Sequence, residues 1–197
     1  MLAPLSRRAA LLLPLIALPL LTAGCQRGVI DNELAAELAY LGLDRAIDRM
    51  IDLGFDGFNA ANSANIPTQY GNGDEIGDME VGGQVDQGAS ANKGMRLEVT
   101  LSNYSDGPVQ DTAIYYTGGP GNADFMLKGL PDADFDGTFN GVYTMDGDLA
   151  GTVELNLQIA GQTADTGDGT IARVPGTITV VGTATSDYGV FDVNVSL

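Results

Sequence analysis

The residues best suited to chemistry in this sequence form an acidic segment with regular spacing. Asp132, Asp134 and Asp136 alternate along the chain, and Gly137 follows them directly. Carboxylates at the first, third and fifth positions of such a segment can converge on one hard cation, and a glycine at the sixth position permits the bend that this needs. The segment therefore predicts a calcium site.

The residues that follow extend the pattern only in part. Thr138 offers its carbonyl oxygen and Asn140 its side chain, so the segment resembles the first half of an EF-hand loop. Tyr143 stands where that loop needs a bidentate Glu, and the flanking residues alternate like strands. The two interpretations are a calcium loop between β-strands, closed by Asp146 or Asp148, and an Asp/Gly-rich turn without metal.

Composition excludes most other catalytic chemistry. The 197 residues include no His and one Cys, which rules out a Ser-His-Asp triad, a Cys-His pair, a His-bearing zinc site and an intramolecular disulfide. Nine Lys and Arg against 26 Asp and Glu give a formal charge of −17, which argues against binding to nucleic acid. We expect a protein that is not an enzyme; a catalytic pair of carboxylates is the alternative.

The first 25 residues have the pattern of an export signal. Arg7 and Arg8 precede an uncharged stretch over residues 9–22, which is shorter than the roughly 20 residues that span a bilayer as a helix. A basic head, a short apolar body and a small-residue end are typical of a secretory signal peptide. That end resembles the lipobox of bacterial lipoproteins and reads Leu21-Thr22-Ala23-Gly24-Cys25.

The resemblance implies that residues 1–24 are removed and that Cys25 becomes a lipidated first residue. Several acyl chains hold a protein firmly in a membrane. Gln26 rather than Asp follows Cys25, which implies sorting to the outer membrane of a Gram-negative-type bacterium, facing the periplasm or the cell surface. Cleavage takes away Arg7 and Arg8 and no acid, so the charge of −17 becomes −19. Residues 25–30 would form the anchor and a short tether.

A helical pattern follows the tether over residues 31–53. Asp31 or Asn32 can cap its start, Gly42 is a weak point, and Gly54 and Gly57 are expected to end it. Its apolar face comprises Leu34, Leu38, Leu41, Leu43, Ile47, Met50 and Ile51.

One face of this helix carries an acidic stripe. Its members recur every four residues and are Asp44, Asp48, Asp52 and Asp56. Like charges at this spacing repel, and Arg45 and Arg49 are placed to pair with Asp48 and Asp52. We expect a solvated face with partial pairing; the alternative is a metal-binding stripe.

The remaining chain divides into a connection and a β domain. Residues 54–77 are rich in Gly, Asn and Ala and predict a long connection, and residues 78–197 alternate apolar and polar side chains. Four turn signals separate the strands: Asp106-Gly107-Pro108, Gly118-Gly119-Pro120-Gly121, Asp146-Gly147 and Asp168-Gly169. The fold class expected is mainly β, with about eight strands in an antiparallel meander that forms a sandwich or small barrel, and one N-terminal helix packed on it.

These patterns predict an outer-membrane-anchored lipoprotein that acts as a non-enzymatic binding or structural module of the cell envelope. Its acidic surface favours cationic partners or divalent ions, and a cationic or envelope protein is the expected kind of protein partner. The alternative is a carrier of a lipid or other apolar ligand, which needs a cavity of roughly 300 Å³ or more between helix and sheet.

Overall fold

The computed structural model describes residues 30–197, and these form two helices in succession and nine strands. The elements in chain order are α1 (Asn32–Leu41), α2 (Asp44–Ala60), β1 (Asn65–Asn72), β2 (Ile76–Val85), β3 (Asn92–Ser105), β4 (Ile114–Lys128), β5 (Asp134–Gly147), β6 (Gly151–Asp165), β7 (Ile171–Arg173), β8 (Thr179–Ser186) and β9 (Gly189–Ser196). Neither helix is long and apolar enough to cross a membrane, as far as the described residues show.

The predicted helix starts as expected and breaks at its weak point. The Asp31 carboxylate caps α1 by accepting from the Leu34 N–H at 2.9 Å. At the break, a Cβ on Gly42 would lie 2.2 Å from the Tyr116 hydroxyl oxygen, and that hydroxyl donates to the Ala39 carbonyl at 3.0 Å. Gly42 therefore lets a buried tyrosine reach the helix backbone.

The predicted end of the helix at Gly54 and Gly57 is wrong, because α2 continues to Ala60. Both glycines face the sheet at close range. A Cβ on Gly54 would lie 2.5 Å from a methyl carbon of Leu97, and one on Gly57 would lie 2.4 Å from Ile66. Here glycine serves close packing between helix and sheet rather than helix termination.

The predicted connection over residues 54–77 is also wrong, since it contains the end of α2 and a whole strand. β1 pairs with β2 in antiparallel register, from Asn65 opposite Gln84 to Asn72 opposite Asp78. A register shift between Ile66 and Gln69 accommodates Pro67, whose missing N–H suits an irregular edge strand.

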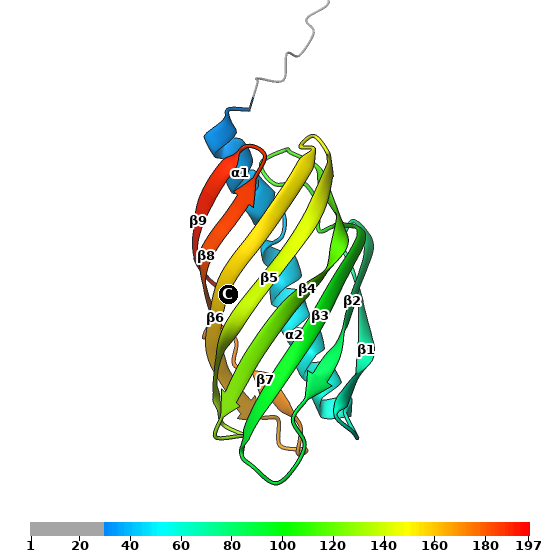
Figure 1. Cartoon of the computed structure of the whole chain (residues 1–197), viewed down its shortest axis with the longest axis vertical. Coiled ribbons are helices and arrows are strands. Elements are labelled where there is room, and N and C mark those ends of the chain that lie inside the picture. Colours follow the sequence, from blue (N-terminus) through cyan, green and yellow to red (C-terminus); the bar gives the residue numbers. More distant parts are fainter. Residues whose placement is uncertain (1–29) are drawn as a thin grey trace, which may run out of the picture.

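The fold class is confirmed: the chain is mainly β, its strands are antiparallel, and the N-terminal helices pack on the sheet. One sheet has the order β1-β2-β3-β4-β5-β6-β8-β9, with β7 pairing to the end of β6, and it is not closed (Figure 1). The hairpin at Asp146-Gly147 joins β5 to β6, and the turn at Asp168-Gly169 joins β6 to β7. The expected turn at residues 118–121 is instead part of β4, where the ladder to β5 shifts register between Gly118 and Asn122 and so passes the proline.

The curved sheet buries its inner face against the helices. β3, β5 and β6 alternate buried and exposed side chains over most of their length, as the sequence pattern predicts. The largest fully buried side chains include Tyr40, Tyr104, Tyr116, Tyr143, Phe125, Phe135, Leu38, Leu43, Ile47, Met50, Ile51 and Met79. Each such side chain stabilises the fold by about 1.5–3 kcal/mol through burial of apolar surface.

The helices fill the opening between the two edge strands. α1 contacts β8 and β9, whereas α2 contacts β1, β2, β3 and β7. In Figure 1 the two helices follow one another along the inside of the curved sheet. The helix thus takes the place that a further strand would occupy in a closed barrel.

Salt bridges hold α2 along this opening. The expected pairing of Arg45 and Arg49 with aspartates of the same helix is wrong. Arg49 donates to Asp106 at 2.8 Å and to Asp74 at 2.7 Å, and Arg45 lies 3.5 Å from Asp74. Their partners therefore belong to the β1–β2 turn and the end of β3, not to α2.

The acidic stripe has a partner from the sheet. The Arg173 guanidinium on β7 donates to both Asp48 and Asp52, with its Nη2 at 3.0 and 2.9 Å from their carboxylates. Only 15% of the Arg173 side chain is exposed. Two members of the stripe thus hold a strand on the helix.

Candidate functional site

The predicted calcium residues on β5 lie in a row rather than in a ring. Asp134, Asp136, Thr138 and Asn140 are all exposed on the outer face of the sheet. Alternate residues of a strand are about 6–7 Å apart, whereas calcium ligands must meet at one ion. Asp132 precedes the strand. The structure does not bring these side chains together around one point.

Their side chains also have protein partners. Asp136 pairs with Lys128 on β4, and Asp134 accepts from the Gln162 amide at 3.2 Å. In residues 30–197 no group of three or more His, Cys, Asp or Glu side chains is arranged to hold a metal ion. Calcium binding stays a prediction; it requires that calcium raise the melting temperature of the parent protein and not that of Asp134→Ala.

The lipidation residue Cys25 and the signal over residues 1–24 lie outside the described residues. The first described residue is Ile30, and α1 starts at Asn32. Residues 26–31 span at most about 20 Å when fully extended. A lipid on Cys25 would therefore hold the α1 end of the domain close to the membrane.

The space between helix and sheet is filled by side chains. The cavity found there, lined by residues that include Ile47, Met50, Val99, Phe139 and Leu155, has a volume of about 10 Å³. That is about the room for one water molecule, whereas small-molecule pockets measure about 300–1,000 Å³. The interior described here therefore gives no support to a carrier.

A half-buried carboxylate lies at the junction of the helices. Asp44 lines a cleft of about 340 Å³ together with Arg45 and Asp106. Burial raises the pKa of Asp44, and a hydrogen bond of 3.0 Å from the Tyr40 hydroxyl opposes this rise in part. Asp106 accepts a hydrogen bond from Arg49, so Asp106 belongs to the salt bridges that hold α2 on the sheet.

Tyr104 joins the same group of hydrogen-bonded side chains. Its hydroxyl donates to Asp106 at 2.8 Å and accepts from Arg49 at 2.5 Å. Burial, followed by the contact with Asp106, raises the pKa of Tyr104 well above its usual range. Because the Asp106 carboxylate is already engaged by two side chains, the geometry favours a structural role over a catalytic pair with Asp44.

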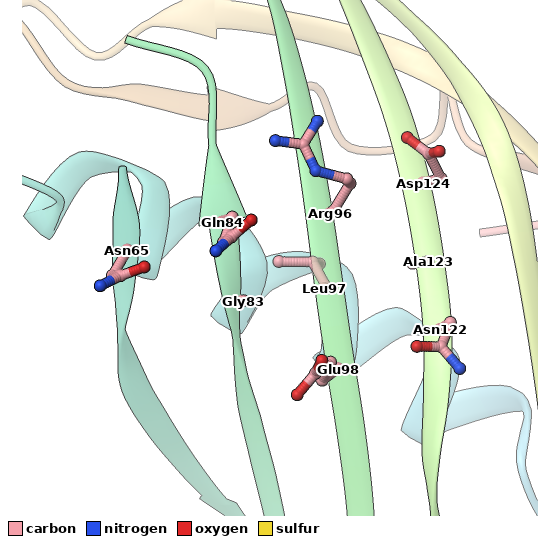
Figure 2. Close-up of a pocket in the computed structure, with 9 residues that line it drawn as sticks. All are labelled: Asn65, Gly83, Gln84, Arg96, Leu97, Glu98, Asn122, Ala123 and Asp124. Carbon is pink, nitrogen blue, oxygen red and sulfur yellow. The ribbon is translucent and has the colours of Figure 1, made fainter. Parts of the chain in front are cut away.

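The outer face of the sheet carries a groove of about 470 Å³ over β1 to β4. Its polar lining residues project from four neighbouring strands, as Figure 2 shows, and are Asn65, Gln84, Arg96, Glu98, Asn122 and Asp124. Its floor is formed at Gly83, Leu97 and Ala123. All six polar residues are exposed.

A second groove of about 360 Å³ lies over β5 to β8 on the same face. Thr138, Gln158, Thr179 and Val181 line it, together with Asp136 from the predicted calcium segment. Asp124 at the margin of the first groove is the direct cross-strand partner of Thr138 in the second. The two grooves are therefore adjacent, one lined from β4 and the other from β5.

Strand register places the two grooves along one line. A single row of paired, exposed residues crosses eight strands and comprises Asn65, Gln84, Arg96, Asp124, Thr138, Gln158, Val181 and Asn194. Both grooves follow this row. We call them together the transverse groove. It runs across the strands from β1 to β8, a span of about 30 Å at the usual strand spacing.

Three glycines lie beside this row and let the strands approach one another. A Cβ on Gly83, Gly137 or Gly182 would lie 2.0, 1.9 or 2.2 Å from a carbonyl oxygen of the neighbouring strand. No other residue type fits such contacts without separating the strands. Gly83 and Gly182 also have φ values of +140° and +145°, which favour glycine. The path of the backbone under the groove is thus set by glycine.

Charges in the groove are mostly negative. Among the lining residues the one cation is Arg96, and the carboxylates are Glu98, Asp124 and Asp136. Arg96 also donates to Asp86, which directly follows β2, at 3.2 Å. The pKa of Asp86 is lowered, chiefly by the Gly94 N–H that donates to it and then by Arg96. The guanidinium is therefore held beside a carboxylate.

Several amide side chains on this face have no partner in the protein. Asn140, Asn156 and Gln158 make no side-chain hydrogen bond within the described chain, and Asn122 makes one of 3.4 Å to the Pro120 carbonyl. Asn122, Asn140 and Asn156 are cross-strand neighbours on β4, β5 and β6. Asn140, Asn156 and Gln158 are exposed, so their amide donors and acceptors are free for a ligand.

Comparison with models of protein families, with characterised proteins and with solved structures finds no match for this chain. The groove and its chemistry are therefore the features that bear on function.

Proposed function

We propose that this protein is a lipid-anchored, non-enzymatic binding module of the bacterial outer membrane, and that it binds through the transverse groove. One contrast carries the proposal: the interior is filled, whereas the outer face holds a groove with polar side chains that lack protein partners. A protein that carried an apolar ligand would have the reverse arrangement.

The position of the groove suits a protein tethered at Cys25. β5 begins at Asp134, far from the tether, and ends at Gly147 in the turn towards β6. Thr138 lies nine residues before Gly147, which is about 30 Å along the strand. The groove would then lie on the half of the sheet away from the membrane, where envelope polymers and proteins can reach it.

Cys25→Ser tests the anchor. In a Gram-negative host supplied with labelled palmitate, we expect the parent protein to take up label and to fractionate with the outer membrane. Cys25→Ser should take up none and appear in the soluble periplasmic fraction. Equal fractionation of the two proteins would contradict the anchor.

A co-sedimentation assay tests the groove. We expect the Cys25→Ser protein to sediment with isolated cell envelopes, and the further change Thr138→Arg to weaken this by filling the centre of the groove. Thr144→Arg is the matched control, because Thr144 is an exposed threonine on the same strand outside the groove. The proposal would be overturned if neither variant sedimented less than the parent domain, or if the parent domain itself did not sediment with envelopes.

A further inference from the structure

We infer that the transverse groove takes an extended, uncharged polysaccharide chain, an inference that rests on the proposed binding function. The groove crosses seven strands as a shallow track of about 30 Å. Such a shape suits a linear polymer better than a compact small molecule, which binds in an enclosed pocket.

The amide side chains in and beside the groove match hydroxyl groups. An amide side chain offers both donors and acceptors, as a sugar hydroxyl does. Asn122 and Gln158 line the groove, and Asn140 and Asn156 lie beside it. Asn122, Asn140 and Asn156 present amides on adjacent strands about 4.8 Å apart, and Gln158 lies two residues from Asn156 on β6. This spacing is comparable to the repeat of one sugar ring along an extended glycan, so successive rings can meet successive amides.

Charge decides against acidic polymers. Among the lining residues, Arg96 is the cation and Glu98, Asp124 and Asp136 are the carboxylates. The whole chain, these residues included, has a formal charge of −17. Acidic glycans and nucleic acids would be repelled, whereas a neutral chain meets no such cost.

Backbone pairing decides against a peptide. Peptides that bind sheets usually add to an edge strand through main-chain hydrogen bonds. The groove runs mostly over interior strands, β2 to β8, whose two sides are already paired. It also lacks apolar pockets for anchoring side chains, since Val181 is its one exposed large apolar residue.

The test uses the soluble Cys25→Ser protein and three defined probes: dextran, oligosaccharides of β-linked N-acetylglucosamine, and polygalacturonate as an acidic control. We expect at least one neutral probe to retard the protein in an affinity gel and to shift amide NMR signals along the transverse groove. Polygalacturonate should do neither. Binding of polygalacturonate in preference, or of no neutral probe, would overturn the inference.

Variants locate the binding. Asn140→Ala combined with Gln158→Ala removes two free amides, and at about 1 kcal/mol per hydrogen bond we expect affinity to fall by roughly tenfold or more. Thr138→Arg should abolish binding and Thr144→Arg should preserve it. Affinity for a neutral probe that none of the groove variants changes would place the glycan elsewhere and contradict the inference.

The outcomes separate this inference from the proposed function. Sedimentation with envelopes that depends on Thr138, together with no affinity for the neutral probes, would show that the groove binds another class of ligand. In that case the binding function would stand and the glycan would be excluded. Failure of envelope sedimentation in the parent domain would exclude both.

Discussion

The Asn59 side chain pairs with the backbone of Ile171 as a neighbouring strand would. Its amide nitrogen donates to the Ile171 carbonyl at 2.7 Å, and its oxygen accepts from the Ile171 N–H at 3.0 Å. Asn59 lies in the last turn of α2, and Ile171 begins β7. One carboxamide thus joins the helix to the free edge of a short strand.

Replacing Asn59 should weaken this joint. We expect Asn59→Ala to lower the free energy of unfolding by about 1–2 kcal/mol, because it leaves both Ile171 backbone groups without a protein partner. Chemical denaturation measures the loss, and amide exchange at Ile171 should quicken. Asn156→Ala is the control: this exposed Asn has no partner, and its replacement should change stability by less than about 0.5 kcal/mol. Equal effects would contradict the role of Asn59.

Arg173 should stabilise the fold through its ion pairs with both Asp48 and Asp52. Arg173→Met leaves Asp48 and Asp52, one helical turn apart, to repel each other, and we expect a loss of about 1 kcal/mol after allowance for their exposure. Because salt screens ion pairs, added salt should reduce the difference in unfolding free energy between Arg173→Met and the parent protein. In a background with Asp48→Asn and Asp52→Asn, Arg173→Met should cost clearly less; the same cost in both backgrounds would contradict ionic fastening.

Gly137 should tolerate no side chain. A Cβ there would lie 1.9 Å from the Asp124 carbonyl oxygen, so we expect Gly137→Ala to force β4 from β5 and to cost about 1–3 kcal/mol. Gly82→Ala is the control in another strand, since its Cβ would meet nothing nearer than Thr68 at 3.6 Å. Thermal unfolding measures the melting temperatures of the two variants. Equal melting temperatures would show that the sheet has room at Gly137.

The Asp168 carboxylate should titrate far below its usual range. Hydrogen bonds from the Thr166 hydroxyl, at 2.6 Å, and from the Thr170 hydroxyl and N–H, at 2.6 and 3.0 Å, lower the pKa of Asp168 from 3.8 to about 2. Because the folded-state pKa is lowered, the stabilisation is present above about pH 4 and is lost as the pH falls through about 2.

The carboxyl carbon chemical shift of Asp168 follows this titration. We expect Thr166→Val combined with Thr170→Val to return the pKa towards 3.8, because the two hydroxyl donors are gone and the backbone N–H stays. A midpoint near 3.8 in the parent protein would show that the turn does not hold these hydrogen bonds in solution.

Local patterns predicted which side of a strand is buried, but not where each strand begins. The alternation of Leu97 and Val99 with Arg96 and Glu98 specifies one apolar face whatever the neighbouring strands are, and these residues are buried and exposed as expected. β1 shows no such alternation and contains Pro67. It forms through pairing with β2 and packing against α2, which are long-range effects.

The transverse groove could not be predicted from the sequence because it depends on register. Arg96, Asp124, Thr138 and Gln158 are far apart in the chain, and turn lengths and the shift at Gly118 decide that they align. The acidic segment was visible because its residues are adjacent. Extended pairing in β5 then set its side chains in a line, which a loop motif does not reveal.

The packing of α1 against β8 and β9 joins the first described element to the last. Contacts between residues so distant along the chain slow folding, because most of the chain must be ordered before they form. The hydrophobic face of α1 should therefore stay uncovered until the C-terminal strand is available. A chain that ends before β9 should consequently bind a hydrophobic dye and be degraded rapidly. The 197-residue chain should unfold slowly once α1 has packed against β8 and β9.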